Sequence, residues 1–332
     1  MHRSFLPSFQ PIFQVEDKVV TILETVGQGA FGVVYRVTDQ AGRVYALKVV
    51  DCLNASGIDN AIREAQILKQ LSHENVIPMI AAGQMTNNQG WRILILTEYC
   101  GGGSLNARLG RPSSEETNFK WILQIGEALA YLHSQQIVHR DLKGDNVLLN
   151  ATEDAKLADF GLAREYIALK RIREHGVEGW WTTCYIQYYM NSVVGSPPWM
   201  APEVFDGRYT EKSDIFSFGT LVFAILERDF VMSNTNKPYF GAFKSIPGVG
   251  KVGIGHAMAY YFRANGNPDI TVQFSPGAQG SSALQKIALD AMKYYHYFRP
   301  SAAEIRDRLR SIQESVRLHT SQNSQNYNYC QN

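Results

Sequence analysis

The residue types best suited to chemistry gather in the segment 139–146, which reads HRDLKGDN. Five of its eight residues are charged or ionisable, and apolar residues flank it at 137–138 and 147–149. A solvated loop has no need of such flanks, so these polar groups are predicted to lie against a core. The sequence Asp-Phe-Gly begins thirteen positions after Asn146, at Asp159. Carboxylate and amide oxygens are the ligands that Mg²⁺ prefers, which makes both segments candidates for metal-assisted chemistry.

A glycine-rich segment near the N-terminus reads GQGAFG, from Gly27 to Gly32. Glycine lacks a Cβ and lets backbone N–H groups approach phosphate oxygens closely. This spacing alone is weak evidence, because a dinucleotide site also requires a helix at the last glycine and an acidic residue about 20 positions on. The next residues, Val33-Val34-Tyr35, favour a strand instead. The glycines therefore predict a hairpin that covers phosphate groups.

Lys48 stands in the apolar stretch VYALKVV, sixteen residues after Gly32. A lysine in such a strand is costly to bury unless its charge is paired. One interpretation is an edge lysine that extends its ammonium group to water. The other is an ion pair with Glu64, which falls on the following predicted helix in otherwise apolar surroundings. That pair would hold the ammonium group toward a bound anion.

The elements that position these residues change in type along the chain. Short runs of β-branched residues between 19 and 50, and again at 76–80 and 93–96, predict strands. Apolar residues at helical spacing predict helices at 58–71, 119–132, 211–228, 281–293 and 300–316. Three glycines at 101–103 mark a joint between a strand-rich first third and a helical remainder. The pattern predicts an α+β protein of two unequal lobes.

Composition excludes several classes of protein. The 332 residues are 45% hydrophobic, which is enough apolar mass for a folded core. Lys and Arg number 32 against 31 Asp and Glu, so we expect no nucleic acid as the main partner. The four cysteines are scattered without CxxC spacing, which argues against zinc sites and disulfides. No signal peptide is recognised and the longest apolar run is too short for a bilayer, so we expect an intracellular protein without membrane insertion.

Several motifs, taken in order, resemble those of the eukaryotic protein kinases over roughly residues 20–315. They include the glycine-rich segment, Ala-Leu-Lys at Lys48, HRDLKxxN and Asp-Phe-Gly. The motifs that follow are Ala-Pro-Glu at 201–203, Asp-Ile-Phe-Ser-Phe-Gly at 214–219 and Arg299. So many independent matches in one order make the resemblance highly specific.

The resemblance implies a bilobal protein kinase fold. The N-lobe, at 19–100, is expected to contain an antiparallel five-stranded sheet with one helix. The C-lobe, at 101–316, is expected to be mostly helical and to include an activation segment at 159–203. The ends of the chain are expected to be an N-terminal arm at 1–18 and a disordered polar tail at 317–332.

The resemblance also implies the roles of the reactive side chains in phosphoryl transfer. Asp141 accepts or orients the proton of the substrate hydroxyl, and Lys143 neutralises the γ-phosphate. Lys48 binds the α- and β-phosphates of ATP and pairs with Glu64. Two further residues supply oxygen ligands to Mg²⁺, and these are Asn146 and Asp159. ATP and Mg²⁺ are therefore the expected cofactors.

A further set of residues is expected to bind the nucleotide. The hairpin backbone covers the phosphates, apolar side chains enclose the adenine, and backbone groups after the last N-lobe strand bond to its edge. Together with Lys48, these residues are Gly27, Gln28, Gly29, Gly32, Val34, Ala46, Glu98, Cys100 and Leu148. Outside this set, Glu203 and Arg299 fall where the family forms a buried ion pair.

The acceptor hydroxyl is expected to belong to serine or threonine. Lys143, two positions after Asp141, and Ser196, just before the Ala-Pro-Glu motif, both resemble the Ser/Thr-specific pattern. Asp145 is a candidate to attract a basic residue N-terminal to the target hydroxyl. Ser104 weakens that expectation, because relatives that prefer basic substrates often carry an acid at this position.

Regulation is expected to involve the activation segment. Arg140 precedes the catalytic aspartate, as in kinases whose activation segment is ordered by a phosphate. Ser192 lies at the usual phosphosite offset, and Arg140 and Arg164 would bind a phosphate there. Thr182 and Thr183 are second choices. The alternative is that these residues are loop hydroxyls without a regulatory role.

We expect a protein serine/threonine kinase that transfers the γ-phosphoryl group of ATP to protein substrates, with Asp141 as catalytic base. The alternative is a kinase-fold scaffold with weak or no catalysis. Such proteins usually lack a residue equivalent to Lys48, Asp141 or Asp159, and all three are present here. A small-molecule or lipid kinase is disfavoured by the Ala-Pro-Glu motif, which in the family supports a peptide-binding ledge.

Two parts of the C-lobe depart from the common pattern. The segment 229–280 fits the family poorly, and its glycine-rich run at 246–256 is interpreted as a loop that replaces the usual substrate-docking helix. The run 213–231 resembles the small group of PDZ-and-LIM-protein-interacting kinases, which implies a nuclear or actin-associated location. We therefore expect a cytoplasmic location, a nuclear location or both, with cytoskeletal or scaffold partners that the sequence does not identify.

Overall fold

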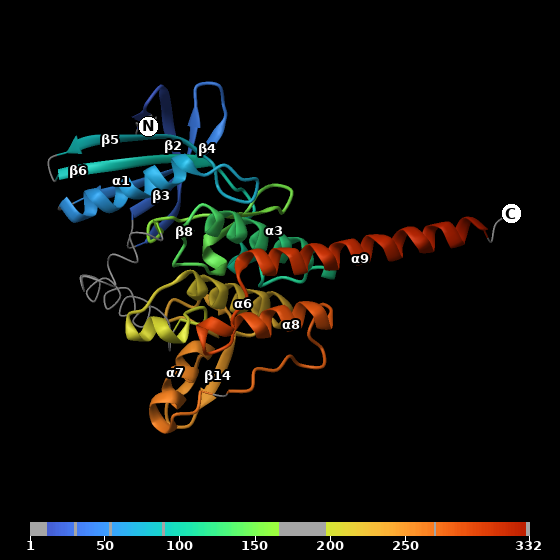
Figure 1. The fold of residues 1–332 in the computed structure, drawn as a ribbon. Coiled ribbons are helices and arrows are strands. Elements are labelled where there is room, and N and C mark those ends of the chain that lie inside the picture. The colour runs from blue at the N-terminus through green and yellow to red at the C-terminus, as the bar shows by residue number, and fades with distance from the viewer. Residues whose placement is uncertain are drawn as a thin grey trace, which may run out of the picture. The chain divides into compact units, whose positions relative to one another are not determined.

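The computed structural model describes residues 12–29, 32–52, 55–87, 90–165, 197–268 and 270–329. The chain divides into two compact units, both drawn in Figure 1. The first comprises Met1–Gly101 with Ala158–Leu162, and the second comprises Gly102–Leu157 with Ala163–Asn332. The boundary after residue 101 lies one position beyond the expected one. Ala158–Leu162 was expected in the C-lobe. It belongs to the first unit, where the Asp159 carboxylate bonds to Lys48.

The first unit is an antiparallel sheet of six strands in the order β1-β2-β3-β4-β6-β5, with one helix, α1. Its elements are β1 Ile12–Val15, β2 Lys18–Gly29, β3 Gly32–Asp39, β4 Val44–Cys52, α1 Ala55–Gln70, β5 Met79–Asn87 and β6 Gly90–Glu98. Figure 1 shows α1 running along one side of this sheet, where it packs on β4, β5 and β6. Alternate residues of β4 enter the core, so Leu47 and Val49 are buried and Lys48 faces the other side.

The sheet has one strand more than expected, because β1 forms inside the segment 1–18 that the sequence pattern marks as an arm. β1 pairs with β2 through a two-residue turn, in the register that places Val15 opposite Lys18. Val15 is fully buried and shares a core cluster with Val20 and Leu94. Full burial of one such side chain stabilises the fold by about 1.5–3 kcal/mol. Four residues are too few to display a strand pattern among the surrounding Pro, Phe and Gln.

The second unit is mostly helical. Its helices are α2 Leu105–Arg108, α3 Glu115–Ser134, α6 Glu211–Glu227, α7 Ile254–Asn265, α8 Ser282–Ala291 and α9 Ala302–Tyr329, with 3₁₀ turns η1 Gly144–Asn146, η2 Pro202–Asp206 and η3 His296–Phe298. Ser114, Thr210 and Ser281 cap α3, α6 and α8, since each hydroxyl accepts a bond from a backbone N–H of the first turn. Among the described residues, no helix combines the length and apolar character needed to cross a membrane.

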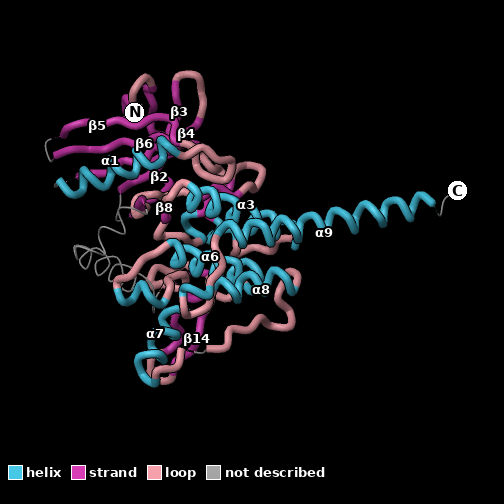
Figure 2. Tube along the Cα trace, viewed as in Figure 1, coloured by secondary structure: helices cyan, strands magenta, loops and turns pink. Residues whose placement is uncertain are grey.

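Helix α9 extends into the segment 317–332 that is expected to be a disordered tail. Figure 2 shows it continuing past the other helices of its unit. No Gly or Pro occurs between Ala302 and Tyr329, so nothing in the sequence interrupts the backbone hydrogen bonds. The polar composition of this segment predicts the absence of a core, and a helix that needs no core contacts is compatible with the same composition.

Short strands hold both ends of the segment 139–146. β8 Ile137–Val138 pairs with β11 Arg164–Glu165, ahead of the segment. After it, β9 lies between two other strands of a three-stranded sheet. The strands of this sheet are β7 Gly103–Ser104, β9 Val147–Leu149 and β10 Ala155–Leu157. The apolar flanks noted in the sequence are β8 and β9, whose residues are buried except for the half-buried Leu148.

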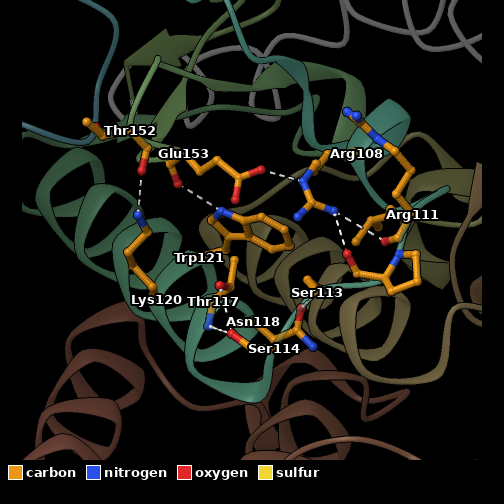
Figure 3. A network of polar contacts seen from close by, with 12 residues as sticks. Arg108, Arg111, Ser113, Ser114, Thr117, Asn118, Lys120, Trp121, Thr152 and Glu153 are labelled. Atoms are coloured by element: carbon orange, nitrogen blue, oxygen red, sulfur yellow. Dashed lines mark hydrogen bonds and ion pairs between the residues drawn. The ribbon is translucent and has the colours of Figure 1, made fainter.

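A polar network fixes the turn between β9 and β10 (Figure 3). The Glu153 carboxylate pairs with Arg108 of α2, and the Glu153 backbone oxygen accepts a bond of 2.9 Å from the indole of Trp121 in α3. Lys120 donates to the backbone oxygen of Thr152 at 2.8 Å. Because Trp121 is fully buried, the turn is tied to the core of the unit. The strand that continues from HRDLKGDN is thereby held in place.

The segment 229–280, whose glycine-rich run at 246–256 was interpreted from the sequence as a loop, contains regular structure. It forms two hairpins and a helix, namely β12 Phe230–Met232 with β13 Pro238–Phe240, β14 Phe243–Ile246 with β15 Gly250–Gly253, and α7. Ile246, Val252 and Ala257 pack together as a small core of their own. The loop interpretation was therefore wrong, because frequent glycines mask the few apolar residues that form this core.

Candidate active site

Lys48 lies in β4, and its ammonium group bonds to two carboxylates of the first unit. The distances from Nζ are 2.7 and 2.9 Å to the two oxygens of Glu64, in α1, and 2.8 Å to Oδ1 of Asp159. The Glu64 side chain is 5% exposed and that of Lys48 is 15% exposed. The predicted Lys48–Glu64 pair is confirmed, and the edge-lysine interpretation is excluded. Helical and strand spacing do not reveal the bond to Asp159, which lies 111 positions away.

The surroundings of Lys48 keep it charged. Burial alone would lower the pKa of Lys48, because its ammonium group loses hydration. The negative charges of Asp159 and Glu64 outweigh burial and raise the pKa of Lys48 above its usual value. A permanent positive charge on a rigid strand suits the binding of an anion such as a phosphate.

The glycine-rich segment forms the predicted hairpin, at the junction of β2 and β3. Gly29 stands opposite Gly32, and Val34 stands opposite Lys48 in the neighbouring strand. Gly32 has a φ of 125°, and a Cβ at this position would overlap the backbone of Val49. Only glycine fits such a conformation without strain. The two residues at the hairpin tip, 30 and 31, lie outside the described residues.

The other residues expected to bind the nucleotide are distributed over both units. Those in the first unit are Gly27 and Gln28 in β2, Ala46 in β4, Glu98 at the end of β6 and the buried Cys100. Leu148 lies in β9 of the second unit. Their contact with a nucleotide stays a prediction from the resemblance.

Asp141 lies between β8 and η1 and is 2% exposed. The Lys143 ammonium group donates to Asp141 Oδ2 at 2.6 Å. The side-chain nitrogen of Asn146 donates to the same oxygen at 2.9 Å and to the Asp141 backbone oxygen at 2.8 Å. One carboxylate oxygen is thus held by two donors. The chain itself therefore fixes the orientation of the Asp141 carboxylate.

A second buried carboxylate, Asp214 in α6, holds the backbone of the same segment. It accepts the His139 N–H and the Arg140 N–H, each at 2.8 Å, and Nε2 of His133 lies 3.1 Å from Oδ2. Arg140 has a φ of 71°. A left-handed backbone in a residue other than glycine costs about 1–3 kcal/mol and persists where its surroundings hold it. The bonds that Asp214 accepts hold the backbone in this conformation one residue before Asp141.

The charge of Asp214 is stabilised despite its burial. Burial alone would raise the pKa of this carboxyl, but the hydrogen bond and charge of His133 and the bonds from the backbone outweigh burial. The pKa of Asp214 therefore lies below its usual value. In the sequence, Asp214 stands out only as part of a motif, and nothing marks His133. A signal did exist, because an acid that opens an apolar run ending at Leu226 requires a buried partner.

Glu203 and Arg299 form the expected buried ion pair. Two parallel bonds join the guanidinium group to the carboxylate, at 2.7 and 2.8 Å. The Ser213 hydroxyl also donates to Glu203, at 2.9 Å, and Arg299 donates to the backbone oxygen of Lys212 at 2.8 Å. The Arg299 side chain is fully buried. The pair therefore ties the Ala-Pro-Glu motif to the start of α6.

The residues expected to carry a regulatory phosphate, Ser192, Thr182 and Thr183, lie outside the described residues. Both arginines expected to bind it are described. The Arg140 guanidinium group lies 4.7 Å from the centre of the Tyr209 ring, and Arg164 donates to the Ala163 backbone oxygen at 2.8 Å. Neither contact tests the phosphosite, which stays a prediction.

Asn146 and Asp159, the expected ligands of Mg²⁺, supply an amide oxygen and a carboxylate. Because the Asn146 nitrogen donates to Asp141, the amide oxygen is the atom suited to a cation. The Asp159 side chain bonds to Lys48 through Oδ1 and is 33% exposed. Within the described ranges, no group of three or more His, Cys, Asp or Glu side chains is placed to hold a metal. Asn146 belongs to the second unit and Asp159 to the first, and each supplies an oxygen of the kind that Mg²⁺ prefers.

Comparison with known proteins identifies this arrangement. The family described as protein kinase domain matches residues 20–308. Mitogen-activated protein kinase kinase kinase 3 of Homo sapiens is 32% identical over 289 residues, which are 84% of this chain and 40% of that protein. Serine/threonine-protein kinase 10-A of Xenopus laevis is 33% identical over 213 residues, or 61% of this chain and 20% of that protein.

A third relative is calcium-dependent protein kinase 5 of Plasmodium berghei (strain Anka). It is 31% identical over 207 residues, which are 60% of this chain and 33% of that protein. In all three comparisons the match spans 40% or less of the relative's length. The family match at residues 20–308 includes the segments whose geometry is described above.

Proposed function

Because the chain belongs to the protein kinase family, we propose that it transfers the γ-phosphoryl group of ATP to serine and threonine hydroxyls of protein substrates. The observation that carries the proposal is the buried Asp141 carboxylate, with Lys143 and Asn146 bonded to it. Asp141 orients the acceptor hydroxyl and takes its proton. Lys143 places a positive charge beside the group that is transferred.

Phosphoryl transfer requires alignment and neutralisation of charge more than covalent help from the protein. Lys48, fixed by Glu64 and Asp159, binds the α- and β-phosphates. Asn146 and Asp159 hold Mg²⁺, which supplies further positive charge to the phosphates when bound. Asp214 keeps the backbone next to Asp141 in its left-handed conformation, so the base stays in place.

A kinase-fold scaffold with little catalysis is the competing function. Replacing a whole buried ion pair by apolar residues is often neutral or stabilising, whereas keeping it offers little stability. A chain without catalysis therefore has no physical need for buried pairs such as Lys48–Glu64 and Asp141–Lys143. Both pairs are intact, which supports catalysis over scaffolding.

The acceptor class is tested with three peptides that differ only in the acceptor, which is Ser, Thr or Tyr. We expect phosphate transfer from γ-³²P-labelled ATP to the Ser and Thr peptides to be faster than to the Tyr peptide, because Lys143 belongs to the Ser/Thr-specific pattern. The Asp141→Asn variant, purified in parallel, controls for a contaminating kinase. A Tyr peptide phosphorylated fastest would contradict the proposal.

We also propose that autophosphorylation at Ser192 activates the protein, with Arg140 and Arg164 binding the phosphate. Mass-spectrometric mapping after incubation with ATP and Mg²⁺ is expected to find phosphate at Ser192, and Ser192→Ala is expected to reduce activity. Thr183→Ala serves as the comparison. Full activity of the Ser192 variant, with no phosphate found at that position, would end the idea.

The place of action is a further proposal. The four scattered cysteines support a reducing, intracellular compartment, and the run 213–231 supports kinship with the PDZ-and-LIM-protein-interacting kinases. Fluorescence microscopy of the tagged full chain is expected to find it in the cytoplasm, the nucleus or both. Accumulation in the secretory pathway would contradict this placement.

A further inference from the structure

We propose that Lys237, on the β12–β13 hairpin, sets substrate specificity by neutralising Asp145 beside the catalytic aspartate, so that the protein shows no preference for basic residues in its substrates. The inference rests on the proposed kinase function and concerns which peptides that activity accepts. It reverses the expectation from sequence that Asp145 attracts a basic residue. The reversal comes from the segment 229–280, whose sequence fits the family poorly.

The central observation is an ion pair. Lys237 Nζ lies 2.6 Å from Asp145 Oδ1, and the Asp145 side chain is 18% exposed. Burial alone would lower the pKa of Lys237, but the charge of Asp145 outweighs it and raises the pKa above its usual value. Lys237 therefore stays positively charged at physiological pH, and its ammonium group lies beside the Asp145 carboxylate before a peptide binds.

The position of Asp145 makes this charge relevant to the substrate. Asp145 lies in η1, directly before Asn146, whose side chain bonds to the Asp141 carboxylate. Charges in water interact over about 8 Å at physiological ionic strength. Because Asn146, the neighbour of Asp145, bonds to Asp141, we expect a peptide whose hydroxyl reaches that base to come within such a distance of Asp145. An uncompensated Asp145 would attract a basic side chain there, and a compensated one does not.

The hairpin that carries Lys237 is fixed to the catalytic segment by a buried amide. Asn106 donates to the Pro238 backbone oxygen at 2.8 Å and accepts the Phe240 N–H at 3.2 Å. Asn106 also packs on η1, since a Cβ added to Gly144 would lie 3.1 Å from the Asn106 Cβ. Asn106 is 3% exposed, so both contacts form inside the unit. Lys237 is therefore attached to a positioned backbone next to η1.

Aromatic contacts connect the same hairpin to Lys143 through the ring of Trp199. The Lys237 ammonium group lies 5.2 Å from the centre of the Tyr239 ring, and this ring lies 5.9 Å from the ring of Trp199. The Lys143 ammonium group lies 5.5 Å from the Trp199 ring. Ammonium groups are attracted to the faces of aromatic rings, which stabilises both lysines in these positions. A basic substrate residue thus meets two ammonium groups and a neutralised carboxylate.

The test uses a set of serine peptides in which one arginine is moved through successive positions before the acceptor, with an all-alanine peptide as reference. The measured quantity is the kcat/KM of each arginine peptide divided by that of the reference. For the wild type we expect ratios near or below one. For Lys237→Ala we expect the ratio to rise at one position by about fivefold, the size of one exposed charge pair. Adding Asp145→Asn to this variant is expected to abolish the rise.

The chain offers a matched control in Lys251, on the β14–β15 hairpin. Lys251 pairs with Asp229 at 2.5 Å and lies 4.9 Å from the Phe243 ring, so it repeats the contacts of Lys237 away from η1. Lys251→Ala is expected to leave every ratio unchanged. A wild type that already prefers arginine as strongly as Lys237→Ala does would overturn the inference.

A binding measurement separates this inference from the proposed function. The affinity of alanine-for-serine versions of the same peptides, followed by fluorescence anisotropy, needs no catalysis. A gain in affinity for the arginine peptide in Lys237→Ala supports the inference, whether or not phosphate is transferred. Such a gain without any phosphate transfer would count against the kinase proposal alone. Phosphate transfer without any change in the arginine ratios or affinities counts against the role of Lys237 alone.

Discussion

Among single residues, Asp214 shows how a buried carboxylate in α6 holds the backbone of the segment 139–146. It accepts two backbone N–H groups and lies beside His133. In Asp214→Asn one oxygen is replaced by an amide nitrogen that cannot accept an N–H group. A buried donor left unpaired costs about 1–3 kcal/mol. We expect the free energy of unfolding to fall by about that amount and phosphate transfer to fall with it, measured by urea denaturation and by the transfer assay.

The same substitution gives a prediction about pH. The pKa of Asp214 is lower in the folded chain than the usual value of 3.8. A lowered carboxyl pKa contributes stability above the unfolded value, and this stability is lost as the pH falls through the folded value. The difference in unfolding free energy between the wild type and Asp214→Asn should thus be constant near neutral pH and shrink below pH 3.8. A difference that is unchanged in acid would contradict the stabilised charge.

Single residues also show where sequence reasoning succeeds. The Lys48–Glu64 pair was predictable, because a lysine in an apolar strand and a glutamate on an apolar helix each require a partner. Lys237 gave no such signal, since a lysine beside Pro in a polar, glycine-containing stretch has the composition of a loop. Its partner Asp145 lies 92 positions earlier, and only the folded hairpin brings them together.

Among the elements, the segment 229–280 packs against residues 197–200 through glycines. A Cβ at Gly255 would overlap the Met200 carbonyl oxygen, and a Cβ at Gly253 would lie 2.5 Å from that of Pro197. A Cβ at Gly241, outside the glycine-rich run at 246–256, would lie 2.3 Å from the side chain of Pro198. The glycine-rich run therefore serves close approach of two backbones.

Gly255→Ala tests this packing. Extra atoms in a well-packed site cost about 1–3 kcal/mol, and here the obstacle is backbone that cannot rotate away. We expect the free energy of unfolding in urea to fall by at least that amount. Gly277→Ala is the matched control, because nothing lies within 4 Å of the added Cβ. Equal stability of the two variants would contradict the close packing of the segment.

Whether a helix or strand can be predicted from the sequence depends on the length of its pattern of apolar residues. The helices α3, α6 and α8 present apolar faces over ten residues or more and match their predicted segments closely. β1 has four residues and was missed. The hairpins at 230–253 have strands of three or four residues, and their side chains pack locally, so no long period marks them.

At the scale of the whole molecule, each compact unit positions its own set of charged side chains. The first contains Lys48 with both of its carboxylate partners, and the second contains Asp141 with Lys143 and Asn146. Each of these contacts joins residues of the same unit. The geometry of each set therefore follows from the folding of its own unit, and the proposed ATP-dependent transfer would require both sets.

The most direct test of the account is Mg²⁺-dependent phosphate transfer from ATP by the wild type and by Asp141→Asn. The asparagine keeps an oxygen that accepts from Lys143 and Asn146, so the variant is expected to fold and to bind ATP. We predict that the wild type, phosphorylated on its activation segment, transfers phosphate at about 1–100 s⁻¹. The variant should be slower by about 100-fold or more, as expected for loss of a general base. Equal rates would contradict the assignment of Asp141 as the catalytic base. No transfer by a phosphorylated wild type that binds ATP would contradict catalysis itself and favour the kinase-fold scaffold.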